Sequence, residues 1–149
     1  MPKWATNRLV LGLAVFFAAM AMWEFRLKPQ YRPMYERGIV LYHDGRYEPA
    51  LREFERAYQV APNAVEVIVM MGWSNLKLRR YEEARFFFQR AERIDPRNDE
   101  ARLGAAFVAW HGGQRLDVKQ VEKLAVRHAD DADVQALVAA ARKQQRGGN

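Results

Sequence analysis

Hydrophobic residues follow two different patterns along the 149-residue chain. Every residue from Leu9 to Trp23 is apolar, in the run LVLGLAVFFAAMAMW. From residue 31 onward the apolar residues instead recur every three or four positions, which predicts amphipathic helices. In segment 47–57 one such stripe contains Tyr47, Ala50, Phe54 and Ala57. The pattern predicts an all-α domain that follows a membrane-targeting segment.

The apolar run predicts a membrane anchor. Lys3 and Arg8 precede it, and Arg26 and Lys28 follow it, as at the ends of membrane-spanning helices. Fifteen helical residues rise only about 22 Å, against the roughly 30 Å of a hydrocarbon core, so a signal peptide cleaved after Ala19-Met20-Ala21 stays open. We expect an N-terminal tail at 1–8, one transmembrane helix at 9–25 and a linker at 26–32.

The charges that flank this segment nearly balance, so they do not settle its orientation. A short, positively charged N-terminus resists translocation, which favours an N-terminus in the cytoplasm. The excess of arginine over lysine and the many alanines favour a bacterial source. We therefore expect a single-pass protein of a bacterial inner membrane, with its helical domain on the periplasmic side.

Residues 31–98 contain two copies of a 34-residue pattern. A shift of 34 positions aligns identical residues at Gly38 and Gly72, Arg46 and Arg80, Tyr47 and Tyr81, Glu48 and Glu82, Ala50 and Ala84, Phe54 and Phe88, Arg56 and Arg90, Ala57 and Ala91, and Pro62 and Pro96. The period and the run Tyr-x-x-Ala-x-x-x-Phe-x-x-Ala-x-x-x-x-Pro resemble the tetratricopeptide repeat, or TPR. The resemblance implies a solenoid of paired antiparallel helices.

A third, degraded unit follows at about 99–130. Ala106 stands at the glycine position of this unit, and Glu122 replaces the phenylalanine. A helix at about 131–144 is expected to cap the stack, so the TPR solenoid spans 33–145 and residues 146–149 form a tail. Asn63 and Asn98 are expected to cap the helices that follow the prolines.

The strongest functional prediction concerns the concave surface that the first helices of TPR units line. The resemblance places an aromatic and apolar partner-binding groove on Tyr35, Ile39, Tyr42, Val69, Trp73, Leu76, Leu103, Phe107 and Trp110. TPR domains that clamp a chaperone's terminal carboxylate use lysine and asparagine at the inner positions, so this chain does not fit that clamp. An amphipathic helix or apolar segment suits such a surface. Alternatively, these side chains pack on one another, or the last helix fills the groove.

Charge and motifs exclude several classes of function. The formal net charge is +6, but half of it lies beside the apolar run, which argues against nucleic-acid binding. A basic edge at the inter-helix turns, comprising Arg46, Arg79, Arg80 and Arg115, suits an acidic partner or anionic lipid if it is more than a solvated surface. No catalytic motif or metal-ligand spacing occurs, and the three histidines are too dispersed for one metal. We therefore expect no enzyme activity, cofactor, metal or small-molecule substrate.

These observations predict a membrane-anchored TPR scaffold that mediates protein–protein interaction. Such a protein would serve as an accessory subunit or assembly factor of a membrane complex. The alternative is an envelope chaperone or quality-control factor that binds many clients transiently through the same apolar groove. The repeat specifies a scaffold, and the sequence does not name the partner.

Overall fold

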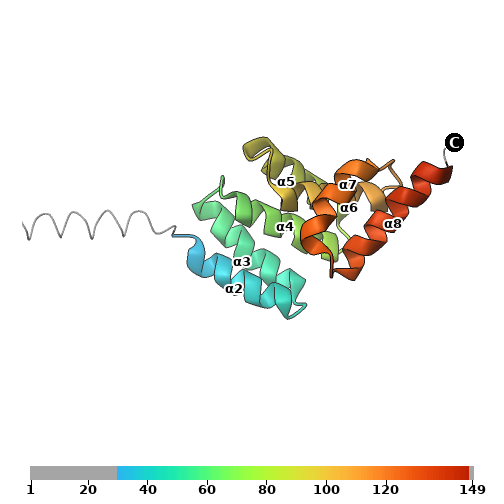
Figure 1. The fold of residues 1–149 in the computed structure, drawn as a ribbon. Coiled ribbons are helices and arrows are strands. Elements are labelled where there is room, and N and C mark those ends of the chain that lie inside the picture. The colour runs from blue at the N-terminus through green and yellow to red at the C-terminus, as the bar shows by residue number, and fades with distance from the viewer. Residues whose placement is uncertain (1–29, 148–149) are drawn as a thin grey trace, which may run out of the picture.

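The computed structural model describes residues 30–147, and these form an all-helical solenoid without strands. Three hairpins stack side by side, and a last helix covers the end of the stack (Figure 1). The helices are α2 (Arg32–His43), α3 (Tyr47–Val60), α4 (Val65–Lys77), α5 (Tyr81–Ile94), α6 (Asp99–His111), α7 (Val118–Ala125) and α8 (Ala132–Gly147), with a 3-10 turn at Val126–His128 between α7 and α8. The expected all-α TPR architecture is confirmed.

The turns inside the three hairpins share one backbone conformation. Gly45, Arg79 and Gly113 lie 34 residues apart and have φ values of 75°, 60° and 67°. Each follows a helix C-terminus, and the next N–H bonds back to a carbonyl five residues earlier, as in Arg80 to Asn75. This is the Schellman arrangement, which favours glycine because a side chain is strained at positive φ. Arg79 is therefore the strained turn of the three.

Only some of the helices have a side-chain N-cap. Asn98 accepts a hydrogen bond from the N–H of Ala101, as expected, and Asp117 caps α7 in the same way. The cap expected from Asn63 is wrong, because Ala64 occupies the N-cap of α4 and no side chain bonds there. Asp131 accepts the N–H groups of Asp133 and Val134 at the start of α8.

Phenylalanine rings pack against glycines where the helices approach most closely. A Cβ on Gly38 would lie 2.5 Å from the Phe54 ring, and a Cβ on Gly72 would lie 2.6 Å from the Phe88 ring. Gly104 of α6 meets Phe88 from the next hairpin, where a Cβ would lie 2.2 Å from the ring. Phe88 is fully buried and therefore joins α4, α5 and α6 through two glycines.

The first helix of the third hairpin has its glycine two residues earlier than the corresponding glycines of the first two hairpins. Ala106 does stand 34 residues after Gly72, but no phenylalanine follows in α7, where Glu122 forms an ion pair with Arg142 at 2.8 Å. Without a ring to accommodate, a Cβ at residue 106 causes no clash. Gly104 serves the ring of the preceding hairpin instead.

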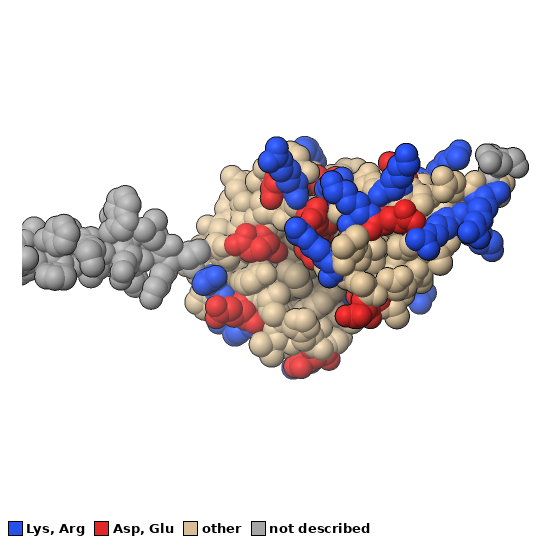
Figure 2. Space-filling model, in the orientation of Figure 1, with Lys and Arg blue, Asp and Glu red and all other residues tan. Residues whose placement is uncertain are grey.

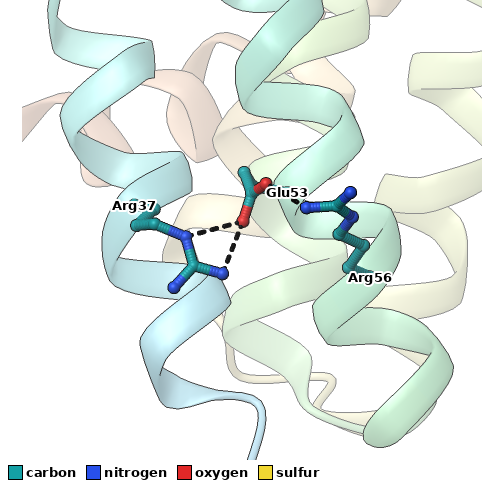
Figure 3. Close-up of polar contacts among 3 residues, drawn as sticks. All are labelled: Arg37, Glu53 and Arg56. Atoms are coloured by element: carbon teal, nitrogen blue, oxygen red, sulfur yellow. Dashed lines mark hydrogen bonds and ion pairs between the residues drawn. The ribbon is translucent and has the colours of Figure 1, made fainter.

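The first hairpin has a polar outer end. Arg37 of α2 and Arg56 of α3 both bond to the Glu53 carboxylate, with Nη–Oε distances of 2.8 Å (Figure 3). In the next repeat the positions of Arg37 and Glu53 hold Met71 and Phe87, which pack against neighbouring apolar residues. The end of a repeat array has no further repeat to cover it, so its outer face is polar.

Residues 30–147 contain no helix that combines the length and hydropathy needed to cross a bilayer. The expected anchor at 9–25, together with the tail at 1–8 and most of the linker, lies outside the described residues.

Replacing Arg79 with glycine should stabilise the domain. Glycine adopts positive φ without the steric cost that arginine meets there, so we expect a gain of about 0.5–1 kcal/mol in the free energy of unfolding. Urea unfolding of wild type and Arg79→Gly measures it. Gly113→Arg is the reciprocal control and should lose a similar amount; equal stabilities for all three proteins would show that these turns are unstrained.

Adding a methyl group at Gly104 should destabilise the domain, because the new Cβ overlaps the Phe88 ring. We expect Gly104→Ala to cost about 1–3 kcal/mol. Phe88→Leu shortens the opposing side chain, so the double variant should lose less than the sum of the single losses, with a coupling of about 1 kcal/mol. Thermal melts of the four proteins measure this coupling, and additive losses would contradict the contact.

Candidate functional site

A groove of about 790 Å³ lies on the concave side of the solenoid. Its floor comes from the inner faces of α2, α4 and α6, and its far wall comes from the junction between α7 and α8. The lining residues are Ile39, Tyr42, His43, Tyr47, Met70, Trp73, Leu76, Lys77, Arg79, Tyr81, Glu100, Leu103, Phe107, Trp110, His111, His128, Asp131, Asp133 and Val134. The groove therefore lies on the surface where the TPR resemblance predicts a binding groove.

Most of the groove residues named from the sequence line this hollow. Tyr35 and Val69 do not, because Tyr35 packs against Phe54 with 5.9 Å between ring centroids and Val69 is buried in the core. Leu76, Leu103 and Phe107 are also buried and form the floor of the groove. The half-buried residues that a partner could reach are Ile39, Tyr42, Trp73 and Trp110.

Aromatic contacts hold the groove walls in place. Trp73 meets Phe88 and Phe107 edge to face, at centroid distances of 5.3 Å and 5.7 Å. Tyr42 packs in the same manner on Tyr47 at 5.2 Å. Such contacts fix the rings before a ligand arrives, so binding would cost little side-chain entropy.

The sequence left open that the last helix fills the groove, and the structure instead puts the start of α8 at its far wall. Asp133, at the start of α8, bonds to Lys77 on α4 with an N–O distance of 3.2 Å. His128 contacts Glu100 on α6 at 3.1 Å. Both contacts are partly solvent-exposed and lie where the α7–α8 junction faces the concave side, so the last helix narrows the groove without filling it. The only sequence signal was the apolar stripe of the capping helix, which does not encode this direction.

Carboxylates face the tyrosines along the concave side. Burial, reinforced by Tyr47 and by the charges of Asp131, Glu100 and Asp133, raises the pKa of Tyr42 well above its usual value. Tyr31 donates a hydrogen bond to the Glu66 carboxylate. This bond, together with burial, raises the pKa of Tyr31 to about 12. The groove is therefore aromatic with an acidic margin, although Lys77 and Arg79 also line it.

The residues of the predicted basic edge lie at successive turns but have different surroundings. Arg80 forms an ion pair with Glu48, and Arg46 is exposed at the start of α3. Arg79 lines the groove, whereas Arg115 lines a separate cavity near the C-terminal end of α8.

The three histidines all line the groove, but they have separate partners. Tyr81 stacks on His111 with 4.9 Å between centroids, whereas His128 faces Glu100. Within residues 30–147 no group of three or more His, Asp or Glu side chains is placed to hold a metal ion.

Comparison with known proteins supports the repeat assignment. Residues 31–64 and 65–98 match the family model described as the tetratricopeptide repeat. The chain therefore contains tetratricopeptide repeats, the protein-interaction module that its 34-residue period predicts. The repeats occupy the four helices from α2 to α5.

Solved TPR domains have the same fold. The Arabidopsis OM64 TPR domain superposes with a TM-score of 0.63 at 16% identity, covering 76% of this chain and 94% of that domain. The second TPR domain of human RPAP3, in complex with the HSP70 peptide SGPTIEEVD, gives a TM-score of 0.57 at 16% identity over 73% of this chain and 92% of that one. The second TPR of Spaghetti (RPAP3), bound to the HSP90 peptide SRMEEVD, gives 0.56 at 22% identity over 59% and 82%.

A curated relative is much longer than this chain. Anaphase-promoting complex subunit 3 of Schizosaccharomyces pombe is 29% identical over 121 residues, or 80% of this chain. The matched region is 18% of that subunit, so this chain spans about a fifth of its length.

Alkaline pH should remove the contribution of the Tyr31–Glu66 hydrogen bond. The pKa of Tyr31 rises from its usual 10.0 in the unfolded chain to about 12 in the folded one, so the stabilisation is complete below pH 10 and is lost as the pH approaches 12. Urea unfolding of wild type and Tyr31→Phe at several pH values measures this. The advantage of wild type should shrink across that window; a constant difference would contradict the bond.

Proposed function

We propose that this chain is a membrane-anchored TPR scaffold that holds an apolar or helical segment of a protein partner in its concave groove. The observation that carries this proposal is the groove between α2 and α8, in which Tyr42, Trp73 and Trp110 remain partly exposed. Tyrosine and tryptophan supply large contact areas at low entropic cost and dominate the binding energy of many interfaces.

The charge around the groove distinguishes it from an acceptor of acidic peptides. Two of the solved TPR neighbours carry chaperone peptides that end in EEVD. In this chain Glu100, Asp131 and Asp133 lie at the margin of the groove. Lys77 and Arg79 also line the groove, and Lys77 pairs with Asp133, so the charge there is mixed. The carboxylates of Glu100 and Asp131 still repel a ligand of the same charge, so the partner segment is apolar.

The surface of the helical domain supports the anchor. Residues 30–147 expose few large apolar side chains, and the outer side of α2 offers mainly Val40 among the polar residues Glu36 and Arg37. Outside the groove the exposed apolar side chains are scattered, so this surface is poorly matched to the fifteen consecutive apolar residues from Leu9 to Trp23. A bilayer buries such a run, and a linker at 26–32 then keeps the solenoid close to the membrane.

The rigid groove favours one defined partner, so the chain acts as an accessory subunit or assembly factor of a membrane complex. The short basic N-terminus favours an orientation with the solenoid on the periplasmic side of a bacterial inner membrane. Transient binding of many clients, as by an envelope chaperone, is the competing role. That role uses the same apolar groove but needs no fixed stoichiometry.

Charge insertion into the groove tests the proposal. Ile39 lines the groove, whereas its neighbour Val40 is 61% exposed and does not. Trp73→Ala is a poorer choice, because it also removes core contacts with Phe88 and Phe107. We expect Ile39→Lys to lose the partner by at least tenfold, and Val40→Lys to keep it, because only the first lysine must be desolvated when an apolar segment binds.

Tagged full-length chain is extracted from its own membrane in mild detergent. Native sizing then gives the size of the complex that contains it, and mass spectrometry identifies the proteins that co-purify. One complex of fixed stoichiometry, kept by Val40→Lys and lost by Ile39→Lys, supports the proposal. A heterogeneous, substoichiometric set of proteins supports the chaperone role. Equal retention by both variants rejects the groove, and recovery of the chain outside the membrane fraction rejects the anchor. Thermal melts of both variants separate a binding defect from a folding defect.

A further inference from the structure

A second cavity lies at the opposite end of the domain from the start of α2 (Figure 1). It has a volume of about 680 Å³ and lies between the end of α6, the turn after it and the last turns of α8. Its lining comprises Trp110, Gly113, Arg115, Ala140, Lys143, Gln144 and Gly147. The cavity thus combines an aromatic surface with two cations and no carboxylate.

Gln144 fixes the two sides of this cavity relative to each other. Its side-chain oxygen accepts the N–H of Leu116 at 3.0 Å, and its amide nitrogen donates to the carbonyl of Gln114 at 3.3 Å. The loop that carries Arg115 is therefore tied to the helix that carries Lys143. The backbone segments that carry the two cations are thus fixed relative to each other, while the Arg115 and Lys143 side chains themselves are exposed.

These cations have no ionic partner within residues 30–147. Arg142, on the same helix, is paired with Glu122 at 2.8 Å, whereas Arg115 and Lys143 are exposed and form no ion pair there. Figure 2 shows lysine and arginine side chains gathered at this end of the molecule, around the C-terminal part of α8. An adjoining cavity of about 210 Å³ next to Arg115 is lined by Lys119 and also by the carboxylate of Asp117, so the uncompensated positive charge lies at Arg115 and Lys143.

We propose that this cavity binds an acidic segment of a protein partner. Carboxylates of the segment pair with the Arg115 guanidinium and the Lys143 ammonium, and an apolar side chain between them lies on Trp110. Arginine binds a carboxylate through two parallel hydrogen bonds, which gives direction as well as charge. A neighbouring acidic side chain can then reach Lys119.

The shape and position of the site favour a peptide over a lipid surface. A bilayer presents a broad plane of headgroups, whereas here the two cations flank Trp110 and Ala140 in a shallow, open depression whose apolar part suits a protein side chain. The cavity also lies at the far end of the solenoid from Arg32, where the chain enters the domain. The site shares Trp110 with the groove but differs from it in charge, so Arg115→Ser and Lys143→Ser test its ligand while the groove lining is left intact.

The test uses full-length chain in an uncharged detergent and a short peptide of alternating glutamate and leucine, with the matching glutamine–leucine peptide as control. Titration calorimetry measures affinity, and the change in tryptophan emission that is present in wild type but absent in Trp110→Phe reports on Trp110, one of four tryptophans in the chain. We expect Arg115→Ser and Lys143→Ser each to weaken the acidic peptide roughly tenfold, the effect of one charge-assisted hydrogen bond. Lys123→Ser is the matched control, because Lys123 is exposed on α7 and lines neither cavity.

The outcomes separate the alternatives. The site is supported if the acidic peptide binds saturably and its affinity falls as salt is added. Lys123→Ser should bind the peptide as tightly as wild type, and Trp110→Phe should lose the change in tryptophan emission. Equal affinity for the glutamine peptide overturns it. Failure of the acidic peptide to bind also overturns it; in that case, Arg115-dependent binding to phosphatidylglycerol vesicles, but not to phosphatidylcholine vesicles, would assign the cations to lipid. Ile39→Lys should leave this binding unchanged, so failure here is distinct from failure of the proposed groove.

Discussion

The architecture depends on the close approach of one aromatic ring to two glycines. Phe88 lies between Gly72 of its own hairpin and Gly104 of the next, so a single side chain connects three helices. Trp73 packs edge to face on the same ring and forms part of the groove. The helix spacing that buries Phe88 therefore also sets the position of a groove wall. Stability and the geometry of the binding surface depend on the same contact.

The fold was predictable because the same 34-residue pattern occurs in two successive repeats. The 34-residue shift pairs Phe54 with Phe88 and Gly38 with Gly72, and the structure places each ring on its glycine. The third unit is harder to read from that shift. The first helix of this unit, α6, has a glycine at residue 104, where it contacts the Phe88 ring of the preceding hairpin. It has an alanine at residue 106, because its own hairpin has no phenylalanine ring to accommodate there. Alignment at a fixed period cannot detect this exchange.

The candidate site was predictable only in part. The inner positions of the first helices include Ile39, Tyr42 and Trp73, which line the hollow in the structure, but periodicity does not separate reachable side chains from a buried one such as Val69. The wall at Asp133 comes from pairing with Lys77, 56 residues away. Long-range pairs of this kind leave no local signal. The C-terminal cavity likewise depends on a loop and a helix that meet through Gln144.

The polar end formed by Arg37, Glu53 and Arg56 limits how the solenoid can grow. A further repeat stacked on α2 would need apolar side chains at these positions, as Met71 and Phe87 provide one repeat later. Burying the three charged groups against another helix would carry a desolvation cost that ion pairing only partly offsets. The same groups discourage end-to-end stacking of separate copies through this face. Duplication of the first repeat would therefore lengthen the array only if this salt bridge were exchanged for hydrophobic contacts.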